Sequence, residues 1–184
     1  MSKNIGILVG SLRKGSYTRA FAKALATQFP KEVNVNFIEI GDLPLYNQDL
    51  DEPDKIPAPW ERVREQVDQA DGIVFATPEY NRSIPGGLKN AIDVISRPFS
   101  NNHWNGKAAL IMSVTPGGLN GVAASLAIRQ SLICLNMKVV QQPEAYIGNA
   151  YKFINDDGKV DEKESPFLKT LADALVNEVN NNKA

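Results

Sequence analysis

The stretch 5-IGILVGSLRKGSYTRA-20 joins an apolar run to the start of a helix through a short polar turn. Residues 5–9 form a short, branched, uninterrupted apolar segment, which is typical of a strand covered on both faces. Helical spacing of apolar residues then runs from Tyr17 to Phe29. A buried strand that passes directly into a helix is the first part of a strand–helix–strand unit, so this stretch predicts an α/β fold.

The same alternation continues along the chain. Further strands are expected at 33–40, 73–77 and 108–114, with a weaker one at 137–141, and helices at 60–70, 88–96, 122–135 and about 166–179. Strict alternation predicts a doubly wound, five-stranded parallel sheet of order 2-1-3-4-5 with helices on both faces. Ligands bind such sheets at the carboxyl ends of the strands, which draws attention to the loops after Val9, Thr77 and Val114.

Composition narrows the classes of function. A chain of 184 residues, 43% hydrophobic and 22% charged, fits a single domain over 1–184, and residues 180–184 have the polar composition of a frayed tail. A net charge of -1 gives no broad positive surface for nucleic acid or an anionic membrane. We found neither a membrane-spanning apolar run nor a secretory signal, and we expect a cytoplasmic protein.

The first loop has the residues of an anion site. Gly10 and Gly15 permit a tight turn, and the start of the next helix offers unpaired amides and a positive dipole end. The P-loop pattern fails because no Lys follows the second Gly, and the dinucleotide pattern G-x-G-x-x-G is absent. A phosphate monoester fits the hydroxyls and charges of Ser11, Arg13, Lys14, Ser16, Thr18 and Arg19. The alternative, a helix capped by Ser16 or Thr18 beside solvated charges, stays open.

The second and third loops are suited to a flat ligand. Pro78 and Pro85 stiffen the second loop, and 86-GG-87 leaves backbone free of side chains beside the polar and aromatic 79-EYN-81. In the third loop, Gly117, Gly118 and Gly121 precede a helix that begins near Val122. Such surfaces suit a planar heteroaromatic ring, although a proline-stiffened turn without a ligand remains an alternative for the second loop.

Few residues here can carry metal or nucleophilic chemistry. His103 is the only histidine and lies in a segment that we expect to be a surface loop, so neither a metal site nor a Ser-His-Asp array is predicted. Trp104 beside it is expected to pack under that loop. Cys134 is the only cysteine, and its apolar helical neighbours predict a buried structural thiol.

Three motifs carry a family resemblance: 10-GSLRKGS-16, 78-PEYNRSIPGGLKNAIDVISR-97 and 129-RQSL-132. The chain resembles the NADPH-dependent FMN reductase family over almost its whole length, and most closely its quinone and chromate reductase branch. The resemblance implies a flavodoxin-like fold and a bound FMN. It implies that the phosphate is held by Ser11, Arg13, Ser16, Tyr17 and Thr18, and that the ring is bordered by Pro78, Glu79, Tyr80, Asn81, Ser113, Gly117 and Gly118.

The resemblance also implies an activity: NAD(P)H reduces the flavin, and quinones or similar small acceptors such as chromate or azo compounds reoxidise it in a ping-pong cycle. No catalytic side chain is then needed, because the flavin carries the chemistry. Relatives form dimers or tetramers, for which 88–99 and 122–135 are candidate contact faces, and they often have an aromatic residue where this chain has Arg82.

Two other functions are less consistent with the sequence. A flavodoxin-like electron carrier is usually strongly acidic so that it docks to basic partners, and a net charge of -1 does not favour it. A regulatory α/β domain that accepts a phosphoryl group needs an acidic cluster with Mg²⁺ at the end of the first strand, where this chain has 7-ILVG-10.

Overall fold

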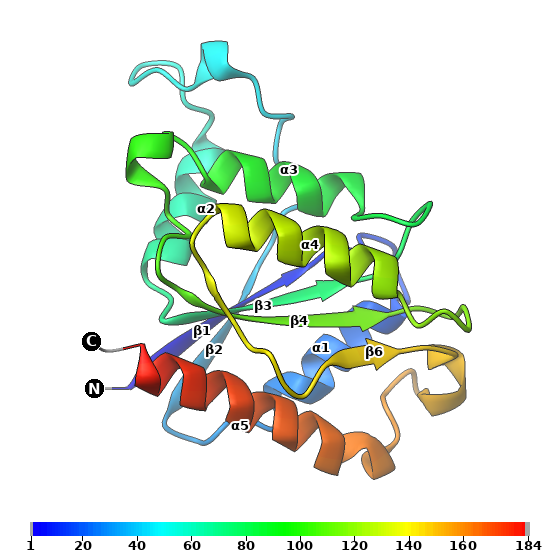
Figure 1. Cartoon of the computed structure of the whole chain (residues 1–184). Helices are drawn as coiled ribbons and strands as arrows, with labels where there is room; N and C mark the ends of the chain where they lie inside the picture. Colours follow the sequence, from blue (N-terminus) through cyan, green and yellow to red (C-terminus); the bar gives the residue numbers. More distant parts are fainter. Residues whose placement is uncertain (1, 183–184) are drawn as a thin grey trace.

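The computed structural model describes residues 2–182, and in this range one sheet lies between two layers of helices (Figure 1). Its strands are β1 (Lys3–Val9), β2 (Val33–Ile38), β3 (Gly72–Thr77), β4 (Ala108–Val114), β5 (Lys138–Val139) and β6 (Ala145–Ile147). Its α-helices are α1 (Tyr17–Ala26), α2 (Ala58–Asp68), α3 (Gly86–Ile95), α4 (Val122–Cys134) and α5 (Ser165–Asn181). Short 3-10 helices are η1 (Gln48–Leu50), η2 (Phe99–Asn101), η3 (Ala150–Phe153) and η4 (Glu162–Glu164).

The strand order is β2-β1-β3-β4-β5, with all pairs parallel, as the sequence predicts. The predicted strand at 137–141 is shorter than expected, as β5, and a second short strand, β6, also pairs with β4. Lys138 of β5 pairs with Ala108, and Ala145 of β6 pairs with Met112 further along β4. Residues 140–144 between them include Pro143, which has no amide hydrogen to donate to a sheet.

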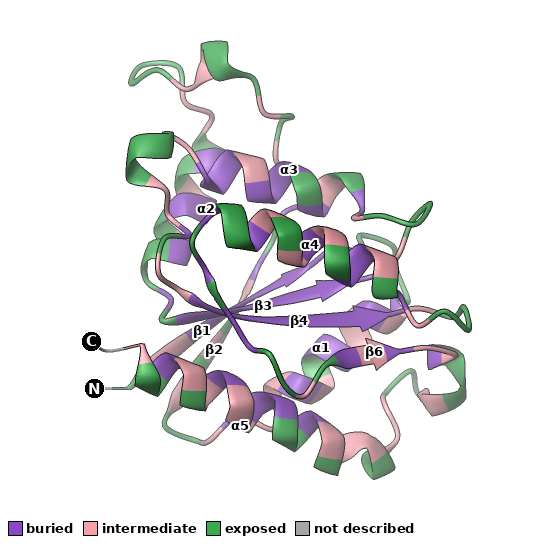
Figure 2. Ribbon diagram, in the orientation of Figure 1, coloured by how far each residue is buried: buried purple, intermediate pink, exposed green. Residues whose placement is uncertain are grey.

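Each face of the sheet has its own hydrophobic core. Helices α1 and α5 cover one face, with Phe21, Leu25 and Leu171 fully buried. Helices α2, α3 and α4 cover the other, with buried Trp60 and Leu88 among their contacts. Figure 2 shows the central strands buried along their length between these layers. Burial on both faces explains why β1, β3 and β4 are continuous apolar runs.

One single-residue expectation is wrong. Cys134 is exposed, because the buried face of α4 carries Ile128 and Leu132 and leaves the end of the helix open. The prediction relied on the apolar neighbours of Cys134, but α4 is also apolar on its outer face, so apolar neighbours do not identify its buried side. His103 lies in the expected loop, although its side chain is only 11% exposed and its Nδ1 lies 2.8 Å from Asp68 Oδ1.

The loop beside His103 and the end of the chain are also defined. Trp104 is fully buried and its Nε1 donates to Ile92 O at 3.0 Å, which confirms its packing under the loop. Helix α5 runs to Asn181 and the side-chain amide of Asn182 donates to Gly106 O, so the described part of the expected tail is ordered by contacts. Residues 183–184 lie outside the described residues. Among the helices of the described chain, none combines the length and apolarity needed to cross a bilayer.

Candidate functional site

The first and second loops pack against each other where β1 and β3 end. Val9 pairs with Ala76, and the Gly10 amide donates to Ala76 O at 2.8 Å. A Cβ at position 10 would lie 3.2 Å from Pro78 Cδ and 3.1 Å from Leu88 Cδ2. Position 10 therefore has little room for a side chain, and glycine lets the two loops approach closely.

The first turn of α1 is capped by the serine that precedes it. Ser16 is the N-cap, and its Oγ accepts from the Arg19 amide at 3.1 Å. The capping alternative is thus correct for Ser16, but a cap satisfies only one of the free amides of a first turn. The Arg13 guanidinium lies 5.0 Å from the ring centre of Tyr17, and Arg13 is exposed. This contact keeps the charge of Arg13 beside the helix N-terminus.

Thr18 and Arg19 are engaged elsewhere. Thr18 is 1% exposed, and its Oγ1 donates to Val114 O at 3.3 Å, which joins α1 to the end of β4. Arg19 binds both carboxylate oxygens of Glu39, at 2.8 and 3.0 Å. This hydrogen bonding raises the pKa of Arg19 and lowers the pKa of Glu39, so both groups are charged at neutral pH. Arg13 is therefore better placed than Arg19 to meet an anion in this loop.

The second loop contains a two-residue turn. Tyr80 and Ser83 pair through both backbone bonds, at 3.2 and 3.0 Å. Asn81 and Arg82 at the tip have φ of 51° and 61°, as in the tight turns of β-hairpins. Pro78 is buried at the base and Tyr80 is 46% exposed. The predicted ring-bordering segment is consequently a defined turn whose tip projects from the protein.

The third loop is built over a buried serine. Ser113 is fully buried and its Oγ donates to Asn120 O at 2.7 Å, so this side chain supports the loop from below and offers no surface to a ligand. Gly121 has φ of 73°, and a Cβ there would lie 2.8 Å from Ser113 Cβ. Gly117 and Gly118 are exposed above this support, where the resemblance places the edge of the ring.

Sequence reasoning missed two contacts of this loop. Asn120 has φ of 59°, and its Oδ1 would lie 1.7 Å from a Cβ at position 148, so Gly148 makes room for it. The dipeptide 120-NG-121 was an available signal, because both residues favour positive φ. The second contact is between the carboxylate of Glu79 and the Ala124 amide, at 3.2 Å. No local pattern signals it, since the two residues are 45 positions apart.

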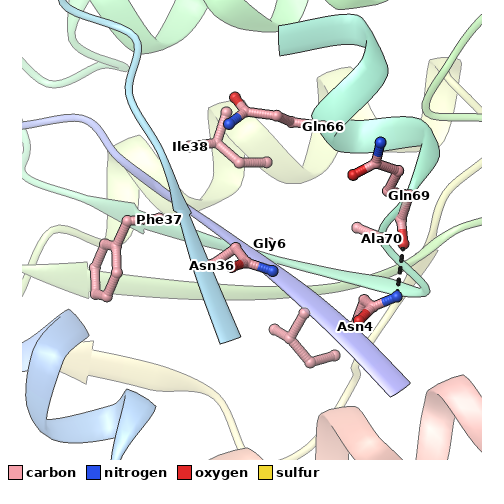
Figure 3. Close-up of a pocket in the computed structure, with 9 residues that line it drawn as sticks. Asn4, Gly6, Asn36, Phe37, Ile38, Gln66, Gln69 and Ala70 are labelled. Atoms are coloured by element: carbon pink, nitrogen blue, oxygen red, sulfur yellow. Dashed lines mark hydrogen bonds between the residues drawn. The ribbon is translucent and has the colours of Figure 1, made fainter. Parts of the chain in front are cut away.

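A separate pocket lies away from these loops. It has a volume of about 270 Å³ and is lined by the amino-terminal half of β1, by β2 and by the end of α2 (Figure 3). Within it, the side-chain amide of Asn4 donates to Gln69 O at 3.2 Å. The loops after β1, β3 and β4 meet at the carboxyl ends of their strands, and this pocket is not part of that edge.

The three loops lie in the part of the chain that matches a known protein family. Residues 3–152 match the family described as NADPH-dependent FMN reductase, a range that includes all three loops. The chain belongs to the NADPH-dependent FMN reductase family. Its resemblance to that family, which rested on the motifs of the first two loops and 129-RQSL-132, is thereby confirmed.

Similarity to individual proteins extends over almost the whole chain. The chain is 46% identical to a quinone reductase of Pseudomonas putida over 98% of its own length and 97% of the relative's. It is 37% identical to a 2-hydroxy-1,4-benzoquinone reductase of a Burkholderia species, over 94% of each chain. Among solved structures it is similar to FerB, an NAD(P)H:(acceptor) oxidoreductase from Paracoccus denitrificans, with a TM-score of 0.89, 34% identity and 98% of each chain covered.

The geometry of the third loop predicts the effect of adding one methyl group. Gly121→Ala places a Cβ against Ser113 at a positive φ, and we expect the free energy of unfolding to fall by about 2 to 4 kcal/mol. Gly118→Ala is the matched control, because its Cβ meets nothing within 4 Å. Urea denaturation of the FMN-free variants measures both. Equal stability of the two variants would contradict the described packing.

Proposed function

We propose that this protein is an FMN-dependent NAD(P)H oxidoreductase that passes electrons to quinones. The observation that carries the proposal is the meeting of the loops after β1, β3 and β4 at one sheet edge, in a chain 46% identical to a quinone reductase. The first of these loops offers a helix N-terminus and Arg13 to a phosphate. The other two offer a tight turn and exposed glycines to a flat ring.

The predicted residues differ in burial, and we divide their proposed roles accordingly. Arg13 and the first turn of α1, from Ser16 and Tyr17, would bind the phosphate through charge-assisted hydrogen bonds. The turn at Tyr80 and Asn81 would border the ring together with Gly117 and Gly118. We assign supporting roles to Ser11, Thr18, Pro78 and Ser113, which are buried at the bases of the loops.

The chain supplies position, and the cofactor supplies the reaction. FMN, when bound, accepts hydride from the nicotinamide and passes electrons on to the acceptor. The protein has to hold the ring at an open edge so that the two co-substrates can use one place in turn. Reduction of chromate and azo compounds and a cytoplasmic location are further predictions for this protein.

Arg13 provides a test of the phosphate site. Arg13→Ala removes a charge-assisted contact worth about 1.5 to 3 kcal/mol, so we expect the Kd for FMN to rise roughly 10- to 150-fold with the fold preserved. Quenching of flavin fluorescence measures the affinity. Lys23→Ala is the control, since Lys23 is an exposed cation in the last turn of α1, at the end remote from this loop, and we expect at most a threefold change. Unchanged affinity in Arg13→Ala would place the phosphate elsewhere.

Kinetics separate the proposed enzyme from an electron carrier. Initial rates with NADPH varied at several fixed concentrations of benzoquinone are expected to give parallel double-reciprocal lines, because the oxidised nicotinamide leaves before the quinone binds. Under anaerobic conditions NADPH is expected to bleach the flavin absorbance and benzoquinone to restore it. Free FMN at the same concentration is the control. A protein that holds FMN but shows no steady-state turnover would be a carrier.

We further propose that the chain assembles as a dimer or tetramer through α4. Val122, Leu126 and Ile133 are 38%, 54% and 68% exposed, and their spacing places them on one side of the helix. An apolar stripe of this kind is unusual on a monomer. Light scattering after gel filtration is expected to give a mass of two or four chains for the wild type and a smaller assembly for Leu126→Lys. Asn177→Lys, which adds the same charge to an exposed position on α5, is the control and is expected to keep the wild-type mass. A monomeric wild type would refute the assembly.

A further inference from the structure

The N-terminus of α4 receives its cap from a different loop. Gly121, the N-cap residue, has no side chain to accept a hydrogen bond from the first turn. Instead, Oε2 of Glu79 accepts from the amide of Ala124, the third residue of the helix, at 3.2 Å. The negative charge also meets the positive end of the helix dipole, which favours it there.

The same carboxylate faces the turn of the second loop. Glu79 Oε1 lies 3.6 Å from Nη1 of Arg82, which stands at the tip of that turn. The side chain of Glu79 is only 11% exposed, whereas that of Arg82 is 67% exposed. An ion pair with so exposed a partner is weak, so the main attachment of Glu79 is to α4.

The contact between Glu79 and Ala124 joins the two loops between which the ring is expected to lie, and the contact with Arg82 stays within the second loop. Glu79 directly precedes Tyr80, where the turn begins, and Ala124 follows the glycines of the third loop. A displacement of either loop would change the width of the space between them. Both carboxylate oxygens already face protein donors, and the side chain is mostly covered.

We propose that Glu79 is a positioning residue that holds the second loop against the N-terminus of α4 and thereby sets the flavin-binding geometry. The inference rests on the proposed function, because it assumes that FMN binds between these loops. Glu79 acts through the backbone of both loops. An acceptor oxygen of the right reach is sufficient for this role, and the negative charge is not essential.

Three variants separate the cap from the charge. Glu79→Ala removes the acceptor, Glu79→Gln keeps an acceptor oxygen without the charge, and Arg82→Ala removes only the ion pair. Glu79→Asp, which shortens the side chain by one methylene, is a milder second variant should Glu79→Ala fail to fold. Two readouts are compared: hydrogen exchange of the amides of 122–125 in the FMN-free protein, and the Kd for FMN with the visible circular dichroism of the bound flavin.

Glu79→Ala is expected to speed exchange in the first turn of α4 and to raise the Kd for FMN about five- to tenfold, with an altered flavin circular dichroism spectrum. Glu79→Gln is expected to restore most of both properties, and Arg82→Ala to change the Kd less than about twofold. Unchanged exchange in Glu79→Ala, or a Glu79→Gln variant as impaired as Glu79→Ala, would overturn the inference. A wild type that binds no FMN would refute the proposed function instead, while exchange in the FMN-free variants would still decide whether Glu79 caps α4.

Discussion

The parallel alignment of β1, β3 and β4 is the constraint on which the rest of the structure depends. Val9 stands beside Ala76, and Thr77 stands beside Ser113, so the three strands end at nearly the same level. Three loops that are far apart in the sequence consequently begin side by side. The helices that follow them are then directed back over the two faces of the sheet, as right-handed crossovers require.

Close packing beneath the loops turns this meeting of strand ends into a defined surface. Gly10 lets the first loop approach the second, and Gly121 lets the third settle on Ser113. Thr18 adds a hydrogen bond from α1 to the end of β4. Buried small and hydroxyl-bearing residues thus support the edge from below, while Arg13, Tyr80 and the exposed glycines remain at the surface. This division is suited to a cofactor that needs to be held rather than chemically activated.

Burial of the sheet on both faces explains which sequence predictions succeeded. Strands β1, β3 and β4 were predictable because burial on both faces requires an unbroken apolar run, and β4 has the predicted bounds. The split of the last strand into β5 and β6 was missed, because the strand is short and one apolar run does not show where pairing stops. Cys134 was misplaced because the outer face of α4 is also apolar, so hydrophobic spacing could not identify its buried face.

The sequence by itself determined the fold class, the strand order and the three loops that meet at one edge of the sheet, because these follow from local periodicity and from motifs such as 10-GSLRKGS-16 and 78-PEYN-81. Only the tertiary structure decided what each polar side chain does there. It pairs Arg19 with Glu39, turns Thr18 and Ser113 inward, and brings Glu79 to the Ala124 amide. The physical reason is that a hydrogen-bond partner is selected by proximity in the folded chain, and these partners are 7 to 96 positions apart in the sequence.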